Sequence, residues 1–211
     1  MNRFQIVLKG VGAGLLQNRM GDDELAGLRD KTRKKSTVAT KPSLFDEAKG
    51  KIHVDGDGDP CIPAEMLMPT LINAGVFIRL DKKRQLSTAK GTLLPGLLTL
   101  EDHSYKLLEP SDKDISKWGL APWRYDMRKG NNPNGAEAVA IVRPLFEKWA
   151  INVTCMLDTD ELPEDTYRKL FDLGGSRVGL GDFRPARKGI FGMFTVVIWK
   201  NITGKTEKKA A

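Results

Sequence analysis

A glycine-rich and basic segment at residues 177–194 constrains how this chain can fold more than any other part of the sequence. Its four glycines are Gly179, Gly181, Gly189 and Gly192. Glycine adopts conformations that interrupt helices and strands, so this spacing predicts a turn-rich loop. Helical spacing of apolar residues precedes the segment at residues 163–174, and a run of β-forming residues follows at 191–199. We therefore expect the loop to join the last helix of the fold to its last strand.

The side chains of this segment indicate a partner that carries phosphate groups. Its basic residues are Arg177, Arg184, Arg187 and Lys188, and its one acid is Asp182. A glycine-rich turn also allows backbone N–H groups to approach a phosphate closely, because no Cβ atom blocks the way. Phe183 adds an aromatic ring of the kind that stacks on bases. The segment therefore predicts a site for a polyanion, with nucleic acid as the first candidate.

The same pattern has a counterpart in a known family. Gly-x-Gly, a basic spacer and Gly-x-x-Gly ahead of a late apolar strand resemble the C-terminal glycine-rich loop of the RAMP superfamily, the RRM-like RNA-handling proteins of CRISPR systems. The resemblance covers the loop well and the rest of the chain as an order of elements, and the spacer is longer than is usual in that family. Short phage-encoded proteins carry a similar stretch, which implies a phage-encoded relative.

The resemblance implies a loop that packs near the sheet and helps to hold an RNA strand. In the backbone subunits of CRISPR effector complexes, copies of such a fold stack into a helical filament along single-stranded RNA, and large inserted loops reach between neighbours. The resemblance therefore implies single-stranded DNA or RNA as the partner and a homo-oligomer along the strand. If the chain comes from a phage, single-stranded DNA is the favoured ligand.

Length and composition agree with a nucleic-acid-binding protein. The chain has 211 residues, of which 40% are hydrophobic, with a net charge of +7 and a pI of about 9.4. This length suits one domain, expected over residues 1–200 and followed by a flexible tail at 201–211. The sequence opens into a strand instead of a signal peptide, and no apolar run approaches the ~20 residues of a membrane helix. We expect no membrane association and a cytoplasmic location, in the host if the protein is viral.

Few residues are available to hold a metal or a cofactor. The cysteines are Cys61 and Cys155, and the histidines are His53 and His103. Two cysteines and two histidines that are distant in sequence do not predict a metal cage or a disulfide framework. Acids alternate at residues 55–59 as in a calcium-binding loop, but Pro60 and Met66 occupy the positions that need glycine and glutamate. We therefore expect no cofactor and no metal, and a tight turn at residues 55–59.

The order of the predicted elements gives the fold class. Predicted strands are residues 4–8, 76–80, 93–100, 104–108, 146–157 and 191–199, and predicted helices are residues 63–74 and 163–174. A hairpin of residues 123–128 with 137–143 is expected around an Asn- and Gly-rich turn. Pro69 is expected to kink the first helix or divide it in two. This order predicts an α+β fold: a ferredoxin-like or RRM-like core with an antiparallel sheet, two main helices and insertions at about 18–60 and 109–135.

Both insertions carry candidate nucleic-acid-binding residues. The first is strongly charged and includes Arg33, Lys34 and Lys35, which either contact nucleic acid or only keep the surface soluble. The second interleaves aromatic and basic residues, namely Trp123, Arg124, Tyr125, Arg128 and Lys129. Such aromatic side chains stack on unpaired bases while the cations bind phosphates, or they anchor a long loop onto the core. The sequence leaves both alternatives open.

Three functions are consistent with these features. The first is a single-stranded nucleic-acid-binding protein without sequence preference, which assembles along its ligand and is not an enzyme; Trp123, Tyr125 and Phe183 would hold the bases. The second is a metal-independent endoribonuclease of the RAMP type, for which His53 and His103 are the available acid and base. The third is a structural subunit that assembles without nucleic acid.

Overall fold

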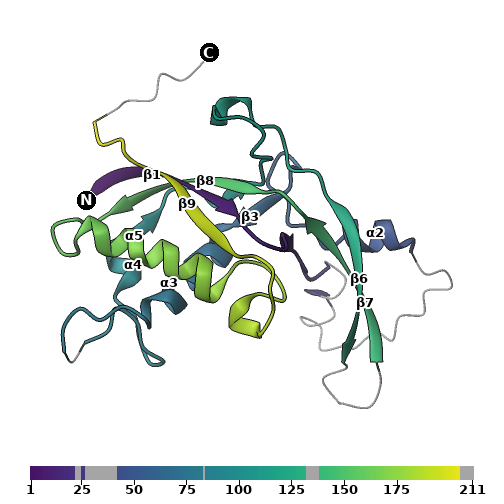
Figure 1. The fold of residues 1–211 in the computed structure, drawn as a ribbon, viewed down its shortest axis with the longest axis horizontal. Helices are drawn as coiled ribbons and strands as arrows, with labels where there is room; N and C mark the ends of the chain where they lie inside the picture. The colour runs from purple at the N-terminus through teal and green to yellow at the C-terminus, as the bar shows by residue number, and fades with distance from the viewer. Residues whose placement is uncertain (22–24, 27–41, 83, 132–137, 205–211) are drawn as a thin grey trace.

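The computed structural model describes residues 1–21, 25–26, 42–82, 84–131 and 138–204, and it shows an α+β fold built on a four-stranded sheet (Figure 1). The strands are β1 (Asn2–Gly10), β4 (Leu98–Leu100), β8 (Ala150–Leu157) and β9 (Phe194–Asn201). They lie in the order β4-β8-β1-β9, and each neighbouring pair is antiparallel. The N-terminal strand is therefore central, with long strands from the second half of the chain on both sides.

Two helices cover one face of this sheet. They are α3 (Ala64–Gly75) and α5 (Glu164–Leu173), which lie side by side below the sheet in Figure 1. The chain passes from β1 through α3 to β4, and from β8 through α5 to β9. Strand β8 lies between β1 and β4, and β1 lies between β8 and β9, so the two strands of each unit are separated by one strand of the other. This is the split β-α-β arrangement of ferredoxin-like folds. The predicted fold class is confirmed by this topology.

The core lies between the sheet and the two helices. Phe4, Ile6 and Leu8 alternate along β1 and are fully buried, as expected when one face of a strand packs against a second layer. The ring centroid of Phe4 lies 5.5 Å from that of Trp199 on β9, and Trp199 meets Phe171 of α5 edge-on at 5.7 Å. These aromatic contacts join three elements that are far apart in sequence.

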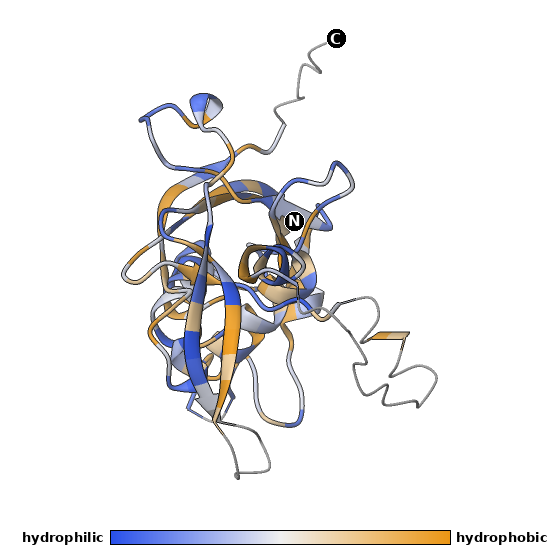
Figure 2. Cartoon of the chain, turned by 90° about the vertical axis from the view of Figure 1, so that its right-hand side faces the viewer, coloured by the Kyte–Doolittle hydropathy of each residue, from blue (hydrophilic) through white to orange (hydrophobic). Residues whose placement is uncertain are grey.

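A second sheet carries a long hairpin away from the core (Figure 1). Its strands are β2 (Leu15–Leu16), β7 (Ala138–Phe146) and β6 (Arg124–Asn131), in that order. The predicted hairpin is confirmed and is longer than expected at both strands. Figure 2 shows that β6 is mostly hydrophilic and β7 mostly hydrophobic. Strand β6 is the edge strand of this sheet, and its residues Arg124, Tyr125, Arg128 and Lys129 are exposed.

The remaining elements are short. They are α2 (Leu44–Lys49), β3 (Cys61–Pro63), α4 (Leu94–Leu97), β5 (Ser104–Lys106), a π-helical turn (Gly174–Val178) and two 3₁₀ turns (Ile115–Lys117 and Pro185–Arg187). Strands β3 and β5 pair with each other. None of the helices in the described ranges has the length and apolar character needed to cross a membrane.

Some element predictions were wrong in detail. Residues 76–80 form no strand and make an isolated bridge between Arg79 and Gln85. The predicted strand at 93–100 starts as the helical turn α4, because Pro95 favours the first turn of a helix, and only its end is β4. The predicted strand at 146–157 is divided between β7 and β8 by a turn at the polar pair Glu147 and Lys148. The last strand begins at residue 194 instead of 191.

Helix α3 is continuous through Pro69, so of the two outcomes expected at this proline, a kink or a division of the helix, the division does not occur. Proline removes one backbone hydrogen bond from a helix. The buried face of α3, which includes Leu67, Leu71 and Ala74, packs into the core and stabilises the helix around the missing bond. The helix also starts one residue later than predicted, with Pro63 as its N-terminal cap.

Candidate nucleic-acid interface

The glycine-rich loop leaves α5 through a π-helical turn. The chain does not stop being helical at Gly174 and Gly175, as the sequence suggested, but widens into the turn Gly174–Val178. Gly175 is necessary there, because an added Cβ atom would clash with the backbone carbonyl of Phe194 on β9. The loop therefore starts from a helix end that is packed tightly against the last strand.

The glycines of the loop serve close backbone packing. Gly181 has a φ of +71°, and an added Cβ atom would clash with the carbonyl oxygen of Leu16. Three glycine N–H groups donate within the protein: Gly179 to Gly174 O at 2.7 Å, Gly189 to Arg184 O at 3.0 Å and Gly192 to Gly14 O at 2.7 Å. The expectation that glycine amides face a phosphate is therefore wrong at these three positions. The glycines instead make the loop compact.

The loop is tied to β2 and to β7. The backbone N–H of Asp182 donates to the carbonyl of Leu16 at 2.8 Å. The carboxylate of Asp182 forms an ion pair with Arg143 of β7 at 2.7 Å, although the Nε–H of Arg143 is not aligned for a hydrogen bond. Beside this pair, Leu16, Leu145 and Phe191 form a small buried cluster. These contacts hold the loop and the hairpin together as one surface.

One cation of the hairpin reaches the loop directly. The guanidinium of Arg128 on β6 lies 4.7 Å from the ring centroid of Phe191. Arg128 is also paired with Asp126 at 2.6 Å, and the hydrogen bond that its guanidinium donates to this carboxylate raises the pKa of Arg128. The ring of Phe191 in turn lies 6.2 Å from that of Phe183. The structure thus brings together Arg128 and Phe183, two predicted site residues from distant parts of the sequence.

The four basic residues of the loop fall into two groups. Arg177, Arg187 and Lys188 are exposed, and the guanidinium of Arg177 lies 5.0 Å from the ring centroid of Phe77, itself an exposed residue at the end of α3. Arg184 is partly buried and donates from Nη1 to the carbonyl of Gly181 at 2.7 Å. Three of the predicted cations are therefore available to a ligand, and Arg184 supports the loop.

The predicted binding residues outside the loop lie in different surroundings. The ring of Trp123 stacks on Phe45 of α2 at 4.7 Å and 20°, so it anchors the chain to that helix instead of facing the loop. Arg124 pairs with Glu147 at 2.8 Å on the exposed surface. Tyr125 and Lys129 are exposed on β6. Arg33, Lys34 and Lys35 lie outside the described residues.

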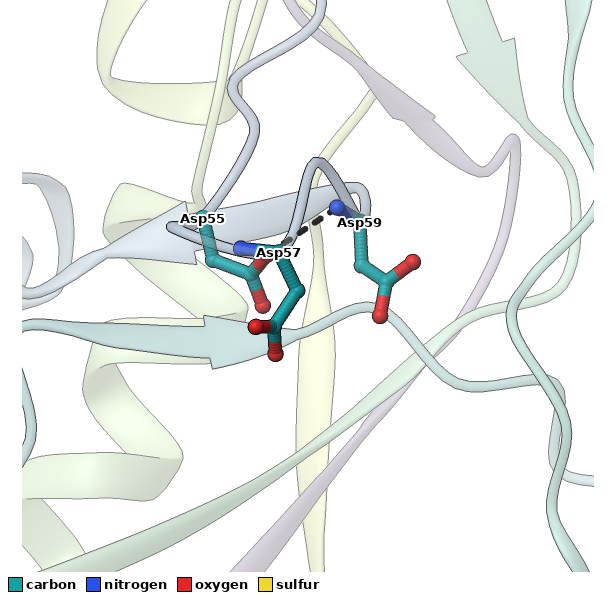
Figure 3. A group of neighbouring side chains, drawn as sticks. All are labelled: Asp55, Asp57 and Asp59. Atoms are coloured by element: carbon teal, nitrogen blue, oxygen red, sulfur yellow. Dashed lines mark hydrogen bonds between the residues drawn. The ribbon is translucent and has the colours of Figure 1, made fainter.

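The predicted turn at residues 55–59 is confirmed (Figure 3). One carboxylate oxygen of Asp55 accepts hydrogen bonds from the backbone N–H groups of Asp57 and Asp59, both at 2.9 Å. The three carboxylates lie close enough to share a cation, and Lys106 of β5 supplies one. Its Nζ lies 2.7 Å from Asp59, 3.0 Å from Asp57 and 3.7 Å from Asp55. The charge of Lys106 therefore balances part of the negative charge of this cluster.

The two histidines have different surroundings. His53 is half-buried, and burial together with the charge of Arg19 lowers its pKa despite an opposing effect of Glu65. Its backbone N–H donates to the side chain of Gln17 at 2.8 Å. His103 is exposed, and its carbonyl accepts from the N–H of Ala64 at the start of α3.

Four residues that contact the glycine-rich loop or form its ion pair were not predicted from the sequence. They are Phe77, Arg143, Asp182 as an ion-pair partner, and Phe191. Phe191 carried a usable signal, because an aromatic residue inside a glycine-rich loop needs an apolar partner. Arg143 carried none, because its partner lies in a different part of the sequence.

Comparison with known proteins gives a likeness in fold. No protein-family model matches the chain, and no curated protein matches it. Among solved structures, the fold is similar to a chain in the cryo-EM structure of the type III-B Cmr-beta complex bound to cognate target RNA. The two are 12% identical with a TM-score of 0.48, and the match covers 96% of this chain and 61% of the other.

Proposed function

We propose that this protein binds single-stranded nucleic acid across the surface formed by the glycine-rich loop and the β6–β7 hairpin. The observation that carries the proposal is the group of exposed cations on a compact loop, Arg177, Arg187 and Lys188, next to a hairpin that presents Arg128 and Lys129. Closely spaced cations on a fixed backbone neutralise successive phosphates of a nucleic-acid strand. The net charge of +7 adds a long-range attraction to any polyanion.

Exposed aromatic rings beside the cations support a single strand over a duplex. Tyr125 on β6 and Phe183 in the loop are both partly exposed, at 44% and 39%. Unpaired bases stack on such rings, while the bases of a duplex are already stacked on one another. Phosphate and stacking contacts carry little sequence information, so the proposed binding is independent of sequence and involves no catalysis.

The proposal extends to assembly along the strand. Copies bound to one nucleic-acid strand would sit close enough to contact each other, which gives a homo-oligomer that grows with strand length. Single-stranded DNA of a phage and single-stranded RNA remain the two ligands to compare, since contacts to the 2′-hydroxyl decide between them.

Fluorescence anisotropy tests the proposal. Labelled single-stranded DNA, single-stranded RNA and duplex DNA are titrated at several salt concentrations, with light scattering after gel filtration to follow mass. We expect tight, salt-sensitive binding to one single strand and growth in mass with strand length. Absence of binding to all three ligands at low salt would contradict the proposal and favour a subunit that assembles without nucleic acid.

A triple substitution locates the site. Changing Arg177, Arg187 and Lys188 to alanine removes three proposed phosphate contacts. The plot of log affinity against log salt should therefore become less steep by about 2. The matched control changes Lys113, Arg168 and Lys169 to alanine, which removes the same charge from exposed positions on other elements. The control should keep most of the salt slope. Equal losses in both variants would mean that net charge, and not this surface, governs binding.

A further inference from the structure

Phe183 has a backbone conformation that aromatic residues rarely adopt. Its φ is +48°, in the left-handed region where a side chain is strained. The surrounding loop holds it there from both sides. Its N–H donates to the carboxylate of Asp182 at 2.8 Å, and its carbonyl accepts from the N–H of Phe191 at 3.2 Å. Strain of this kind persists where the neighbouring structure fixes it, and it is concentrated at ligand sites.

The ring of Phe183 is the exposed end of a row of three neighbouring side chains, Arg128, Phe191 and Phe183. Arg128 lies over the ring of Phe191, which is 2% exposed, and the ring of Phe183 follows with 39% of the residue exposed. A ring that served only to fill the core would be covered as Phe191 is. The row therefore ends in an aromatic surface that faces outward and is supported from behind.

Two cations belong to the same turn as this exposed ring. Arg187 and Lys188 follow Phe183 in the same loop, and both are exposed. The 3₁₀ turn Pro185–Arg187 and the left-handed conformation of Lys188, with a φ of +61°, reverse the chain between them and the ring. Gly189 then packs directly against the carbonyl of Phe183, where an added Cβ atom would clash. An aromatic ring and two cations on one tight turn match the base and the phosphates of a nucleotide.

We infer that Phe183 is the stacking platform for an unpaired base, placed by its left-handed backbone and supported by Phe191 and Arg128. This inference rests on the proposed function and adds the residue that distinguishes a base-bearing strand from any other polyanion. Cations alone bind a phosphate backbone whether or not bases are attached. The stacking contact should therefore appear only with ligands that carry bases.

The experiment compares two ligands of equal charge and length: oligothymidylate, and an oligonucleotide with abasic sites throughout. Oligouridylate is titrated in parallel to cover RNA. The wild-type protein should bind the base-bearing strand about 5- to 100-fold more tightly than the abasic strand. Phe183→Ala should lose most of this difference and keep its affinity for the abasic strand. Phe183→Trp should keep the difference in affinity between the two strands. Phe183→Leu should keep little of it, because leucine is apolar but has no flat ring.

Controls keep the inference separate from the proposed function and from folding. Val197→Ala, at an apolar residue of similar exposure on β9, should not change either affinity. Phe183→Gly removes the ring and the backbone strain together, so it provides a folded variant if alanine disturbs the loop. In a folded Phe183 variant, an equal loss of affinity for both ligands, or no loss for either, would overturn the inference without contradicting the proposed function. Failure of the wild-type protein to bind any strand would overturn the proposed function, and the inference with it.

Discussion

Asp182 and Arg143 form an ion pair at 2.7 Å that joins the glycine-rich loop to the middle of β7. The side chain of Arg143 is only 13% exposed and that of Asp182 31%, so the pair is more shielded from water than the other pairs on the hairpin. Asp182 also accepts the N–H of Phe183. One carboxylate therefore fixes both the position of the loop on the hairpin and the local backbone at Phe183.

Removal of this charge should loosen the loop. Asp182→Asn keeps an oxygen that can accept the N–H of Phe183 but leaves Arg143 without its counter-charge. We expect a loss of about 1–3 kcal/mol in the free energy of unfolding, measured with urea. Glu147→Gln is the matched control, because the Arg124–Glu147 pair is exposed by 58% and 63% and should contribute less than about 1 kcal/mol. Equal effects would mean that the shielding of Arg143 is unimportant.

Two glycines with nearly the same φ should respond differently to alanine. Gly12 and Gly181 have φ values of +75° and +71°, but no atom lies within 4 Å of an added Cβ at Gly12, whereas one at Gly181 would clash with Leu16. Gly12→Ala should cost about 1–2 kcal/mol from backbone strain alone. Gly181→Ala should cost about 3 kcal/mol or more, because overpacking adds to that strain. Urea denaturation measures both, and equal costs would contradict the tight contact between the loop and Leu16.

Lys188 combines a strained backbone with a predicted contact to phosphate. Lys188→Gly relieves the left-handed conformation and should raise the free energy of unfolding by about 1 kcal/mol. It also removes one charge, so affinity for a single strand should fall. Lys188→Ala removes the same charge without relieving the strain, and it should weaken binding to the same extent with no gain in stability. Thermal unfolding and anisotropy together check this pair, and a glycine variant less stable than the alanine variant would contradict it.

The turn at Asp55 should make stability depend on acid. Burial opposes ionisation of Asp55, but the hydrogen bonds from the N–H groups of Asp59 and Asp57 and the charge of Lys106 outweigh it and hold its pKa below the usual 3.8. A lowered pKa in the folded state stabilises the fold above pH 3.8, and this contribution is lost as the pH falls through the folded-state value. Asp55→Asn should lower stability at pH 7 and flatten the decline in acid. Urea melts from pH 2 to 7 measure this, and a decline as steep as in the wild type would contradict the assignment.

The fold could be predicted because its main elements have strong local patterns. The strand at residues 4–8 and the helix at residues 163–174 were predicted correctly, and Tyr167, Leu170 and Phe171 form the buried face of that helix, α5. Helix α2 was missed although Ser43 and Asp46 form a helix-start pattern, in which Oγ of Ser43 accepts the N–H of Asp46 at 3.1 Å. The charged residues around this short helix outweighed that local signal.

The candidate site was only partly predictable. The glycines indicated a loop, but their packing partners Gly14 and Leu16 lie at the other end of the sequence, so the reason for each glycine was not visible. For Trp123 the sequence left open whether the ring stacks on bases or anchors the chain, and only the structure shows its contact with Phe45 of α2. Arg184 looks like its neighbours in sequence, and only its contact with Gly181 separates it from them.

The position of β1 between β8 and β9 has a consequence for how the protein is made. The first strand cannot pair until residues beyond 150 have been synthesised, and its second partner is β9, near the end of the chain. The glycine-rich loop depends on the same late event, because it is anchored on residues 14–16. Contacts between such distant parts of a chain form slowly. A growing chain on the ribosome would therefore be unable to fix the glycine-rich loop, with its cations, on residues 14–16 until the loop itself has been synthesised.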